Sequence, residues 1–277
     1  MRNLSMWIAL AWMAPAALSV GGDDRKIVVK NDVVYGNVHG AGLLADIAYP
    51  EGDGPFPAVL AVHGGRWVGG HRLDASTIKV APWAQVGFFA MSIDYRLAGC
   101  TPAPACYQDM LCALRWLHAH ARQYRIDTKR IFLIGQSAGG HLVSLAATLG
   151  DGPYPRTGGW KDQPHTFRAA ISVAACYELP TLDWGKLWAP PGTDLAVARK
   201  LASPINHVTA KSKPLLIIHA DNDRSVPVKQ AFDMVAALKK AEAQHKFLHS
   251  TDKGHMGITD YVIAEARAFI REVSAKD

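Results

Sequence analysis

Ser137 is the residue whose surroundings most clearly predict chemistry. Residues 135–139 read G-Q-S-A-G, a G-x-S-x-G pattern between the apolar runs 131–134 and 142–149. Strand, sharp turn and helix in this order hold a serine hydroxyl clear of a buried sheet, with glycines where strand and helix approach. The Ala138 N–H then lies at a helix N-terminus, where unpaired donors and the helix dipole favour an anion. The pattern predicts a nucleophilic serine with one oxyanion donor.

Two downstream loops supply candidates for the base and the acid that such a serine requires. Of the twelve histidines, His255 alone lies in a glycine-flanked loop, K-G-H-M-G, directly after a predicted strand and downstream of the serine. The acid is expected in the segment H-A-D-N-D that follows the apolar run 214–219. We prefer Asp223 to Asp221, because Asp221 lies closer to the strand and can instead cap the loop. The predicted triad is Ser137, Asp223 and His255.

A third loop is a candidate for stabilising negative charge. The sequence H-G-G-R-W at 63–67 ends the predicted strand 58–62, where loops that donate backbone N–H groups to an oxyanion are found. The expected donors are the N–H groups of Gly65 and Arg66, together with that of Ala138. The alternative is an ordinary Gly-Gly turn, which would be preferred if the serine motif were missing.

Three side chains are candidates for contact with a substrate. Arg66 and Trp67 are expected at the pocket mouth, and Trp184 lies in the segment 177–208, which has no clean hydrophobic period. That segment is predicted to be a cap or substrate-facing insertion. The alternative for Arg66 is a side chain that points into solvent.

To position these loops, the chain must form a sheet of mainly parallel strands. Short apolar runs alternate with segments of helical period, which is the pattern of an α/β fold with helices on both faces of the sheet. The first two strands are expected to form an antiparallel hairpin. The predicted strands are 26–38, 43–49, 58–62, 88–93, 131–134, 169–174, 214–219 and 245–249, and the predicted helices are 74–86, 104–124, 142–149, 228–241 and 260–273.

The order of several motifs resembles a known family. HGGRW, DYRLA, GQSAGGHL, KLASPI, HADNDRSVP and KGHMG follow one another as in hormone-sensitive-lipase-like and feruloyl/acetyl-xylan-esterase-like (BD-FAE-like) α/β hydrolases, over residues 44–270. The resemblance implies an α/β-hydrolase fold, the triad named above, and His63 as a packing residue under the oxyanion loop. Two residues depart from the usual pattern. Arg66 replaces the third glycine, as in the H-G-G-x-W form of kynurenine formamidases, and Gln136 stands where many relatives carry Asp or Glu.

The N-terminus predicts export. Arg2 precedes an apolar run over 4–20 that is followed by Gly-Gly-Asp-Asp, the pattern of a secretory signal peptide. We therefore expect a signal peptide at 1–21, a single domain at 22–277, and a secreted or periplasmic protein with no stable membrane insertion once the signal is removed. The alternative, an uncleaved anchor, is disfavoured because the run is short and contains Pro15.

Composition restricts the remaining classes. The formal charge is +6, but Lys and Arg are scattered, so no nucleic-acid partner is expected.

The four cysteines fit an oxidising compartment, and Cys100 and Cys106 are spaced to close a small disulfide ring, although four cysteines permit three full pairings. No Cys/His spacing indicates a metal site, and no cofactor is expected. The oligomeric state is left open.

These observations together predict a secreted serine esterase that forms an acyl-enzyme. Its expected substrate is a small-molecule or polysaccharide-linked ester with a short acyl or aromatic acid. Two alternatives stay open: an amide hydrolase of the same fold, and a binding protein built on an inactive hydrolase scaffold.

Overall fold

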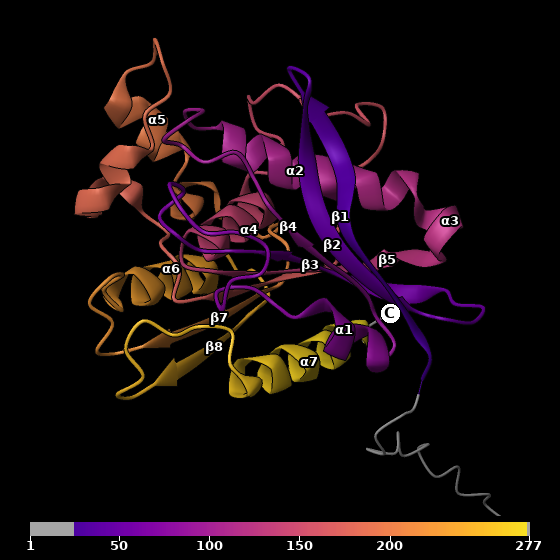
Figure 1. Cartoon of the computed structure of the whole chain (residues 1–277). Coiled ribbons are helices and arrows are strands. Elements are labelled where there is room, and N and C mark those ends of the chain that lie inside the picture. The colour runs from indigo at the N-terminus through magenta and orange to yellow at the C-terminus, as the bar shows by residue number, and fades with distance from the viewer. Residues whose placement is uncertain (1–24, 276–277) are drawn as a thin grey trace, which may run out of the picture.

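The computed structural model describes residues 25–275, so the predicted signal peptide lies outside the described residues. They contain an eight-stranded sheet of order β1-β2-β4-β3-β5-β6-β7-β8 (Figure 1). β1 pairs antiparallel with β2, and β2 with β4, whereas the pairings from β4 across to β8 are parallel. The strands are β1 (Ile27–Val38), β2 (Ala41–Pro50), β3 (Phe56–Val62), β4 (Phe89–Ile93), β5 (Ile126–Gln136), β6 (Ala169–Val173), β7 (Leu215–Ala220) and β8 (His245–Ser250).

The mainly parallel α/β sheet predicted from the sequence is therefore confirmed. β4, β6 and β7 are buried at every position, because parallel strands covered by helices on both faces have no solvent-facing side. The opening hairpin is more exposed, since only Tyr35 and Gly36 of β1 are buried. The order of the strands brings the ends of β3, β5 and β7, and the loop after β8, to one edge of the sheet.

Helices cover the two faces of this sheet (Figure 1). α1 (Val80–Gln85) and α7 (Asp260–Ser274) pack on one face, where Trp83 and Phe269 join a core cluster with the strand residues Val59 and Phe132. The other face carries a second cluster, to which Leu142 belongs. The helices of that face are α2 (Ala105–Ala119), α4 (Ala138–Thr148) and α6 (Lys229–Lys240), and the short α3 (Ala121–Tyr124) follows α2.

The predicted helix over 74–86 is wrong in its first half. Only α1 (Val80–Gln85) is helical, because polar side chains of the preceding residues bond to other segments rather than to a helix. Asp74 Oδ2 accepts the His71 N–H at 2.9 Å, Ser76 Oγ accepts the Gly64 N–H at 3.1 Å, and Thr77 Oγ1 bonds Ser92 Oγ at 2.9 Å. Short hydroxyl and carboxylate side chains compete with helix formation in this way.

Two other boundaries differ from the prediction. The helix expected over 104–124 is interrupted at His120, which separates α2 from α3. The link expected at 126–130 is instead the first part of β5, which therefore runs from Ile126 to Gln136.

The segment 177–208, called the cap segment below, contains short helices. These are η1 (Leu179–Thr181), η2 (Asp183–Leu187), α5 (Leu195–Leu201) and η3 (Pro204–His207), and they project beside the sheet in Figure 1. His141 of α4 joins the cap segment to the domain, since its Nε2 lies 2.7 Å from the Ala202 carbonyl oxygen. Burial lowers the pKa of His141 to about 4, so the ring is neutral at neutral pH.

The cysteine prediction is wrong, because all four cysteines are free thiols in the structure. Cys100 is exposed on the loop before α2, whereas Cys106 is buried in the first turn of that helix. Burial also raises the pKa of the Cys106 thiol, which keeps it protonated. The five residues between the two cysteines therefore do not close a ring.

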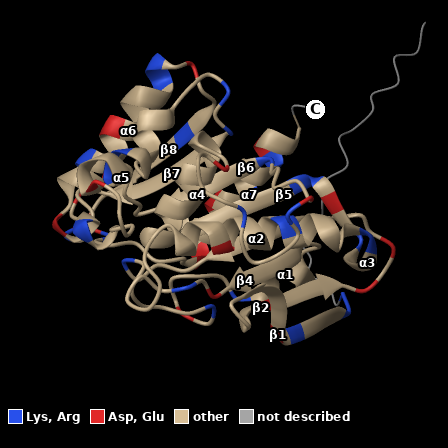
Figure 2. Cartoon of the chain, turned by 90° about the horizontal axis from the view of Figure 1, so that it is seen from above, with Lys and Arg blue, Asp and Glu red and all other residues tan. Residues whose placement is uncertain are grey.

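Charged residues are interspersed over the ribbon in Figure 2. Arg72 illustrates how some of them are used, since it pairs with Asp32, Asp46 and Asp94 and so ties the strand hairpin to the loop before α1. Within residues 25–275, no helix has both the length and the apolar composition that crossing a membrane requires.

Candidate active site

Ser137 lies in a strained turn between β5 and α4. Its φ of 54° and ψ of −117° are uncommon for a residue other than glycine. The turn is closely packed, because a Cβ at Gly135 would overlap the backbone of Gly139, and a Cβ at Gly139 would overlap the carbonyl oxygen of Val62. The Ser137 N–H donates to the Val173 carbonyl oxygen at 2.8 Å, which fixes the turn against β6. The glycines thus allow the close approach that the motif predicted.

His255 and Asp223 form a hydrogen-bonded pair. His255 Nδ1 lies 2.8 Å from Asp223 Oδ2, and the other carboxylate oxygen accepts the N–H groups of Ser225 at 2.8 Å and Val226 at 2.9 Å. Burial alone would raise the pKa of the Asp223 carboxyl. Its hydrogen bonds to His219, His255 and the Val226 N–H outweigh burial and hold that pKa well below the usual range. Asp223 is thus an ionised carboxylate that orients an imidazole.

Asp221, the other candidate acid, has a different place. Its Oδ1 accepts the N–H of Asp252 at 3.1 Å near the surface, so it links the loop after β7 to the loop after β8. Of the two aspartates, the structure brings Asp223 and not Asp221 to His255.

His219 is a neighbour of the pair that the sequence did not single out. This fully buried histidine is the last but one residue of β7, and its Nε2 lies 2.8 Å from the Val226 carbonyl oxygen and 3.4 Å from Asp223 Oδ2. It therefore contacts both the acid and the loop that carries it. Its position four residues before Asp223 could have suggested this contact, but a histidine at the end of a strand is not distinctive.

The loop that carries His255 is tied to the strand that carries Ser137. Gln136 Nε2 donates to the Met256 carbonyl oxygen at 3.0 Å in a buried position. The two residues next to the serine and the histidine are thus directly bonded. Within residues 25–275, Ser137 Oγ itself forms no hydrogen bond, and the His255 side chain is 28% exposed. Such contacts are often loose in enzymes without substrate.

The oxyanion loop (residues 63–70) lies against the serine. A Cβ at Gly64 would come within 3.3 Å of Ser137 Cβ. Gly65 and Arg66 both have positive φ, 102° and 53°, which turns successive peptide groups of the loop. Within the described residues, the N–H groups of Gly65, Arg66 and Ala138 have no protein acceptor, as donors for a developing negative charge require.

His63 packs beneath this loop, as the family resemblance implied. Its ring stacks on Tyr95 with 4.1 Å between ring centroids, and its Nδ1 lies 2.7 Å from the Gly64 carbonyl oxygen. The Tyr95 hydroxyl donates to the carbonyl oxygens of His63 and Gly64 at 3.2 and 3.1 Å. Burial lowers the pKa of His63, so the ring is a neutral packing group rather than a base.

Comparison with known proteins is consistent with this geometry. The protein-family model described as BD-FAE matches residues 45–179 and 187–238, which include Ser137 and Asp223. The chain belongs to the BD-FAE family.

Curated relatives of this BD-FAE chain include esterases of Mycobacterium tuberculosis. The protein named Probable carboxylic ester hydrolase LipM is 29% identical over 227 residues, which cover 77% of this chain and 52% of LipM. Esterase LipC is 28% identical over 218 residues, which cover 73% of this chain and 53% of LipC. The chain thus spans about half the length of these relatives.

Solved structures share the fold. A truncated carbohydrate esterase from gut microbiota superposes with a TM-score of 0.79 at 22% identity, covering 92% of this chain and 99% of that one. The propionate-bound esterase Est2 of Thermogutta terrifontis gives a TM-score of 0.74 at 25% identity, covering 90% of this chain and 94% of Est2. These similarities show that the BD-FAE chain has the α/β-hydrolase fold.

The prediction that Trp67 faces the pocket mouth is wrong. The Trp67 side chain is fully buried, at 0% exposure. The ring packs against Trp184, His141 and Trp188 with centroid distances of 5.0, 5.1 and 5.4 Å. A large aromatic ring gains more from burial than from partial contact with solvent. Trp67 therefore anchors the oxyanion loop to the cap segment.

Arg66 and Trp184, by contrast, do reach a cavity. The Arg66 guanidinium carbon lies 5.8 Å from the centre of the Trp184 ring, and both residues line a cavity of 540 Å³ between the cap segment and the loop after β7. Trp184 Nε1 donates to the Ser225 carbonyl oxygen at 3.0 Å, which joins the cap segment to the loop that carries Asp223.

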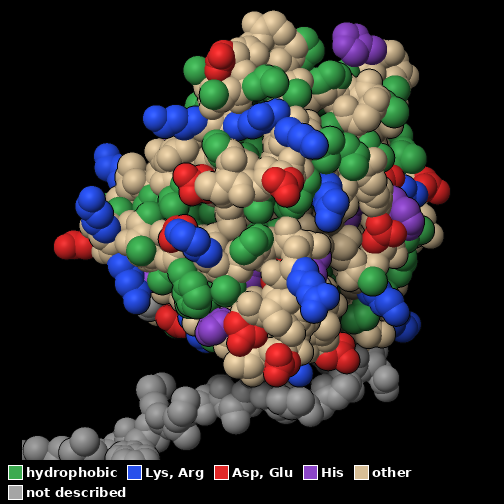
Figure 3. All heavy atoms as spheres, turned by 90° about the vertical axis from the view of Figure 1, so that its left-hand side faces the viewer, with side chains coloured by type: hydrophobic (Ala, Val, Ile, Leu, Met, Phe, Trp, Pro, Cys, Tyr) green, Lys and Arg blue, Asp and Glu red, His purple; other side chains and the backbone are tan. Residues whose placement is uncertain are grey.

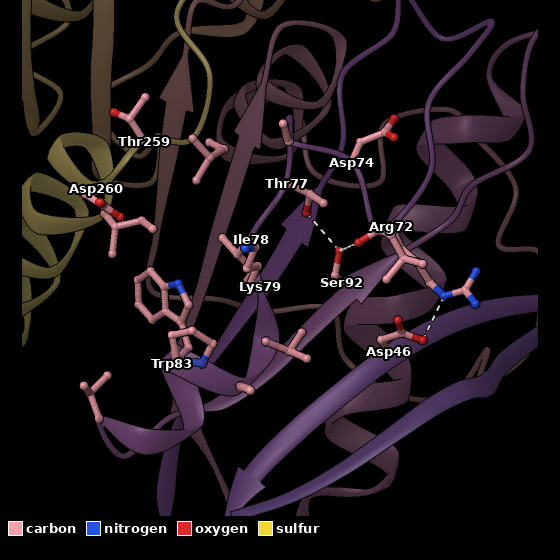
Figure 4. A pocket seen from close by; sticks show the side chains of 18 of the residues that line it. Asp46, Arg72, Asp74, Thr77, Ile78, Lys79, Trp83, Ser92, Thr259 and Asp260 are labelled. Atoms are coloured by element: carbon pink, nitrogen blue, oxygen red, sulfur yellow. Dashed lines mark hydrogen bonds and ion pairs between the residues drawn. The ribbon is translucent and has the colours of Figure 1, made fainter. Parts of the chain in front are cut away.

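A second cavity of the BD-FAE chain lies elsewhere. It has a volume of 870 Å³ and lies beside α1 and the start of α7, with Ile78, Trp83 and Thr259 on its walls (Figure 4). The Ser92 hydroxyl donates to the Arg72 carbonyl oxygen at 2.8 Å within this wall. No residue of the Ser137, Asp223 and His255 set lines it, and no group of three His, Cys, Asp or Glu in residues 25–275 could hold a metal ion.

Proposed function

We propose that this protein is a serine carboxylic ester hydrolase that works through an acyl-enzyme. The observation that carries the proposal is the 2.8 Å contact between His255 Nδ1 and Asp223 Oδ2, formed beside the strained turn of Ser137. A serine hydroxyl alone is a weak nucleophile, and an oriented imidazole is the group that activates it. The names of LipM and LipC, a carboxylic ester hydrolase and an esterase, support the same reaction.

The triad residues and the three oxyanion donors each have a role in the proposed reaction. Ser137 Oγ attacks the ester carbonyl carbon while His255 Nε2 takes the hydroxyl proton, because Nδ1 of the same ring is held by Asp223. The N–H groups of Gly65, Arg66 and Ala138 donate hydrogen bonds to the developing oxyanion. His255 then protonates the leaving alcohol, and water hydrolyses the acyl-enzyme by the reverse sequence. Each oxyanion donor contributes on the order of 2.7–4 kcal/mol to transition-state stability.

The substrate class we propose is an ester of a short acyl or aromatic acid, small or linked to a polysaccharide. The propionate bound to Est2, at 25% identity, supports a short acyl group. The motif order of feruloyl- and acetyl-xylan-esterase-like proteins supports an aromatic or acetyl ester on a carbohydrate. The N-terminal signal pattern supports action outside the cytoplasm.

The test is activity of the Ser137→Ala protein on p-nitrophenyl acetate, methyl ferulate and acetylated xylan. Loss of a triad member lowers kcat on the order of a million-fold. Ser274→Ala is the control, because the Ser274 hydroxyl bonds only the Ile270 carbonyl oxygen of its own helix. A fluorophosphonate probe should label wild type and Ser274→Ala but not Ser137→Ala. Near-normal turnover by folded Ser137→Ala protein would overturn the proposal.

A further inference from the structure

The 540 Å³ cavity between the cap segment and the loop after β7 carries more cations than carboxylates. Its walls carry the cations Arg66, Lys186 and Arg224 and the carboxylate Asp183. All four are exposed, and within residues 25–275 none of them forms an ion pair. Most other arginines here do have acceptors; Arg72 and Arg96, for example, bind carboxylates. Unpaired cations gathered at one hollow create a field that attracts anions.

The cavity adjoins the proposed catalytic groups along the chain. Arg66 directly follows Gly65, the first proposed oxyanion donor, and Arg224 directly follows Asp223. Lys186 belongs to η2 of the cap segment. Figure 3 views the side toward which β7 and β8 point in Figure 1, and Lys and Arg side chains are interspersed there with Asp and Glu. Arg66 therefore joins the two, since its side chain lines the cavity and its N–H group belongs to the proposed oxyanion site.

The Arg66 backbone is constrained, and its exposed side chain contacts the Trp184 ring. Its residue has a φ of 53°, and the following Trp67 has a φ of 64°, so two successive non-glycine residues have left-handed backbone. Such strain is retained where the surrounding structure enforces it. The buried Trp67 ring supplies that enforcement, and the Arg66 guanidinium lies over Trp184, which is itself bonded to Ser225. The guanidinium thus lies at the cavity wall, over the Trp184 ring.

We propose that this cavity is a carboxylate-binding subsite, so that the enzyme prefers esters that carry a second, negatively charged group. The inference rests on the proposed ester hydrolase function. Two guanidinium groups suit a carboxylate, because each can donate two parallel N–H bonds to it. The carboxylate belongs either to the acyl part or to the alcohol part of the ester, and the experiment separates these two sources.

Matched substrates give the test. The acyl arm compares p-nitrophenyl hemiglutarate with p-nitrophenyl pentanoate, and the alcohol arm compares 4-acetoxybenzoate with 4-acetoxybenzamide. In each arm, the ratio of kcat/KM for the anionic ester to that for the neutral ester is measured for wild type, Lys186→Gln and Arg224→Gln. Lys200→Gln is the control, because Lys200 is an exposed cation of α5 that does not line the cavity.

We expect the ratio in one arm to fall about tenfold in Lys186→Gln and in Arg224→Gln, as loss of one charge-assisted contact implies, and to change less than about twofold in Lys200→Gln. The arm that responds identifies the source of the carboxylate. Equal ratios for the cavity variants and Lys200→Gln in both arms would overturn the subsite.

The subsite and the hydrolase proposal fail in different ways. Absence of Ser137-dependent turnover of the neutral esters would overturn the hydrolase proposal alone. Binding of monomethyl glutarate and of 4-hydroxybenzoate to the Ser137→Ala protein, measured by calorimetry, tests the subsite without turnover. Affinity that is about tenfold weaker in the added Arg224→Gln background supports it, and unchanged affinity for both acids contradicts it.

Discussion

The nucleophile turn (residues 135–139) and the histidine loop (residues 251–259) meet at one site but are held by different means. The turn is fixed by its backbone, because glycines at 135 and 139 allow a packing in which no Cβ would fit. The histidine loop is fixed by side chains of other segments. Gln136 Nε2 binds the Met256 carbonyl oxygen at 3.0 Å, and Asn222 Oδ1 accepts the Gly254 N–H at 2.7 Å.

This difference has a mechanical consequence. Close packing of backbone against backbone tolerates no extra atom, since interiors have few voids and low compressibility. A loop held by individual hydrogen bonds loses about 0.5–1.5 kcal/mol when one of them is removed. A substitution that adds an atom in the turn should therefore lower both stability and activity strongly. Substitutions that release the histidine loop should act in graded steps, with the direct Asp223 contact as the exception.

Loss of the direct contact between Asp223 and His255 gives the largest expected effect. Asp223→Asn should lower kcat on p-nitrophenyl acetate on the order of ten-thousand-fold, because an amide no longer selects the productive tautomer of His255 or supports its charge. Asp221→Asn is the matched control. It removes a surface charge but leaves an amide oxygen that still accepts the Asp252 N–H, so its kcat should stay within about threefold of wild type. A larger loss in Asp221→Asn than in Asp223→Asn would show that Asp221 is the acid.

The next effect concerns the turn. Gly139→Ala places a methyl group on the Val62 carbonyl oxygen, so the helix and the strand must separate. Overpacking of this kind destabilises by about 1–3 kcal/mol, and a displacement of roughly 1 Å at the nucleophile costs about a hundredfold in rate. Urea unfolding and kcat on p-nitrophenyl acetate measure the two consequences.

Gly99→Ala is the control for that experiment. A Cβ at Gly99 would meet no atom within 4 Å, so this variant should match wild type in both measurements. If Gly139→Ala keeps full activity and stability, the turn is more compliant than its packing indicates, and the contrast with the histidine loop does not hold.

The two regions also differ in how far the sequence predicts them. The turn was predictable because G-x-S-x-G constrains the backbone directly, and the flanking strand and helix follow from local apolar runs. The contact between Gln136 and Met256 was not predictable, because it joins residues 120 positions apart. From the sequence, Gln136 stood out only as a departure from relatives. Trp67 was misplaced for a similar reason, since its burial depends on aromatic rings of the distant cap segment.

The wrong predictions for residues 74–79 and for the cysteines have the same origin. The residues 74–79 have a helical apolar spacing, but Ser76 and Thr77 bond to the oxyanion loop and to β4, and these long-range bonds outweigh local propensity. The cysteine spacing at 100 and 106 likewise does not predict that Cys100 is exposed and Cys106 is buried. What the sequence leaves open is the set of side chains that join distant loops, and those are the contacts that position His255.

The smallest expected effect tests whether Gln136 positions the histidine loop. Gln136→Met removes the donor to the Met256 carbonyl oxygen without adding charge, and kcat on p-nitrophenyl acetate should fall about tenfold at every pH. Gln136→Glu differs, because a carboxylic acid donates to that carbonyl only when it is protonated, and an ionised one repels it. Burial at this position favours the protonated form.

The ratio of kcat in Gln136→Glu to kcat in wild type should therefore rise as the pH falls from about 8 to about 5, while the Gln136→Met ratio stays constant. A purely structural role for Gln136 would lower both ratios without any pH dependence. Two flat profiles would thus show that the Gln136 amide stabilises the fold but does not set the position of His255. The contacts from Asp221, Asn222 and Asp223 would then hold the histidine loop.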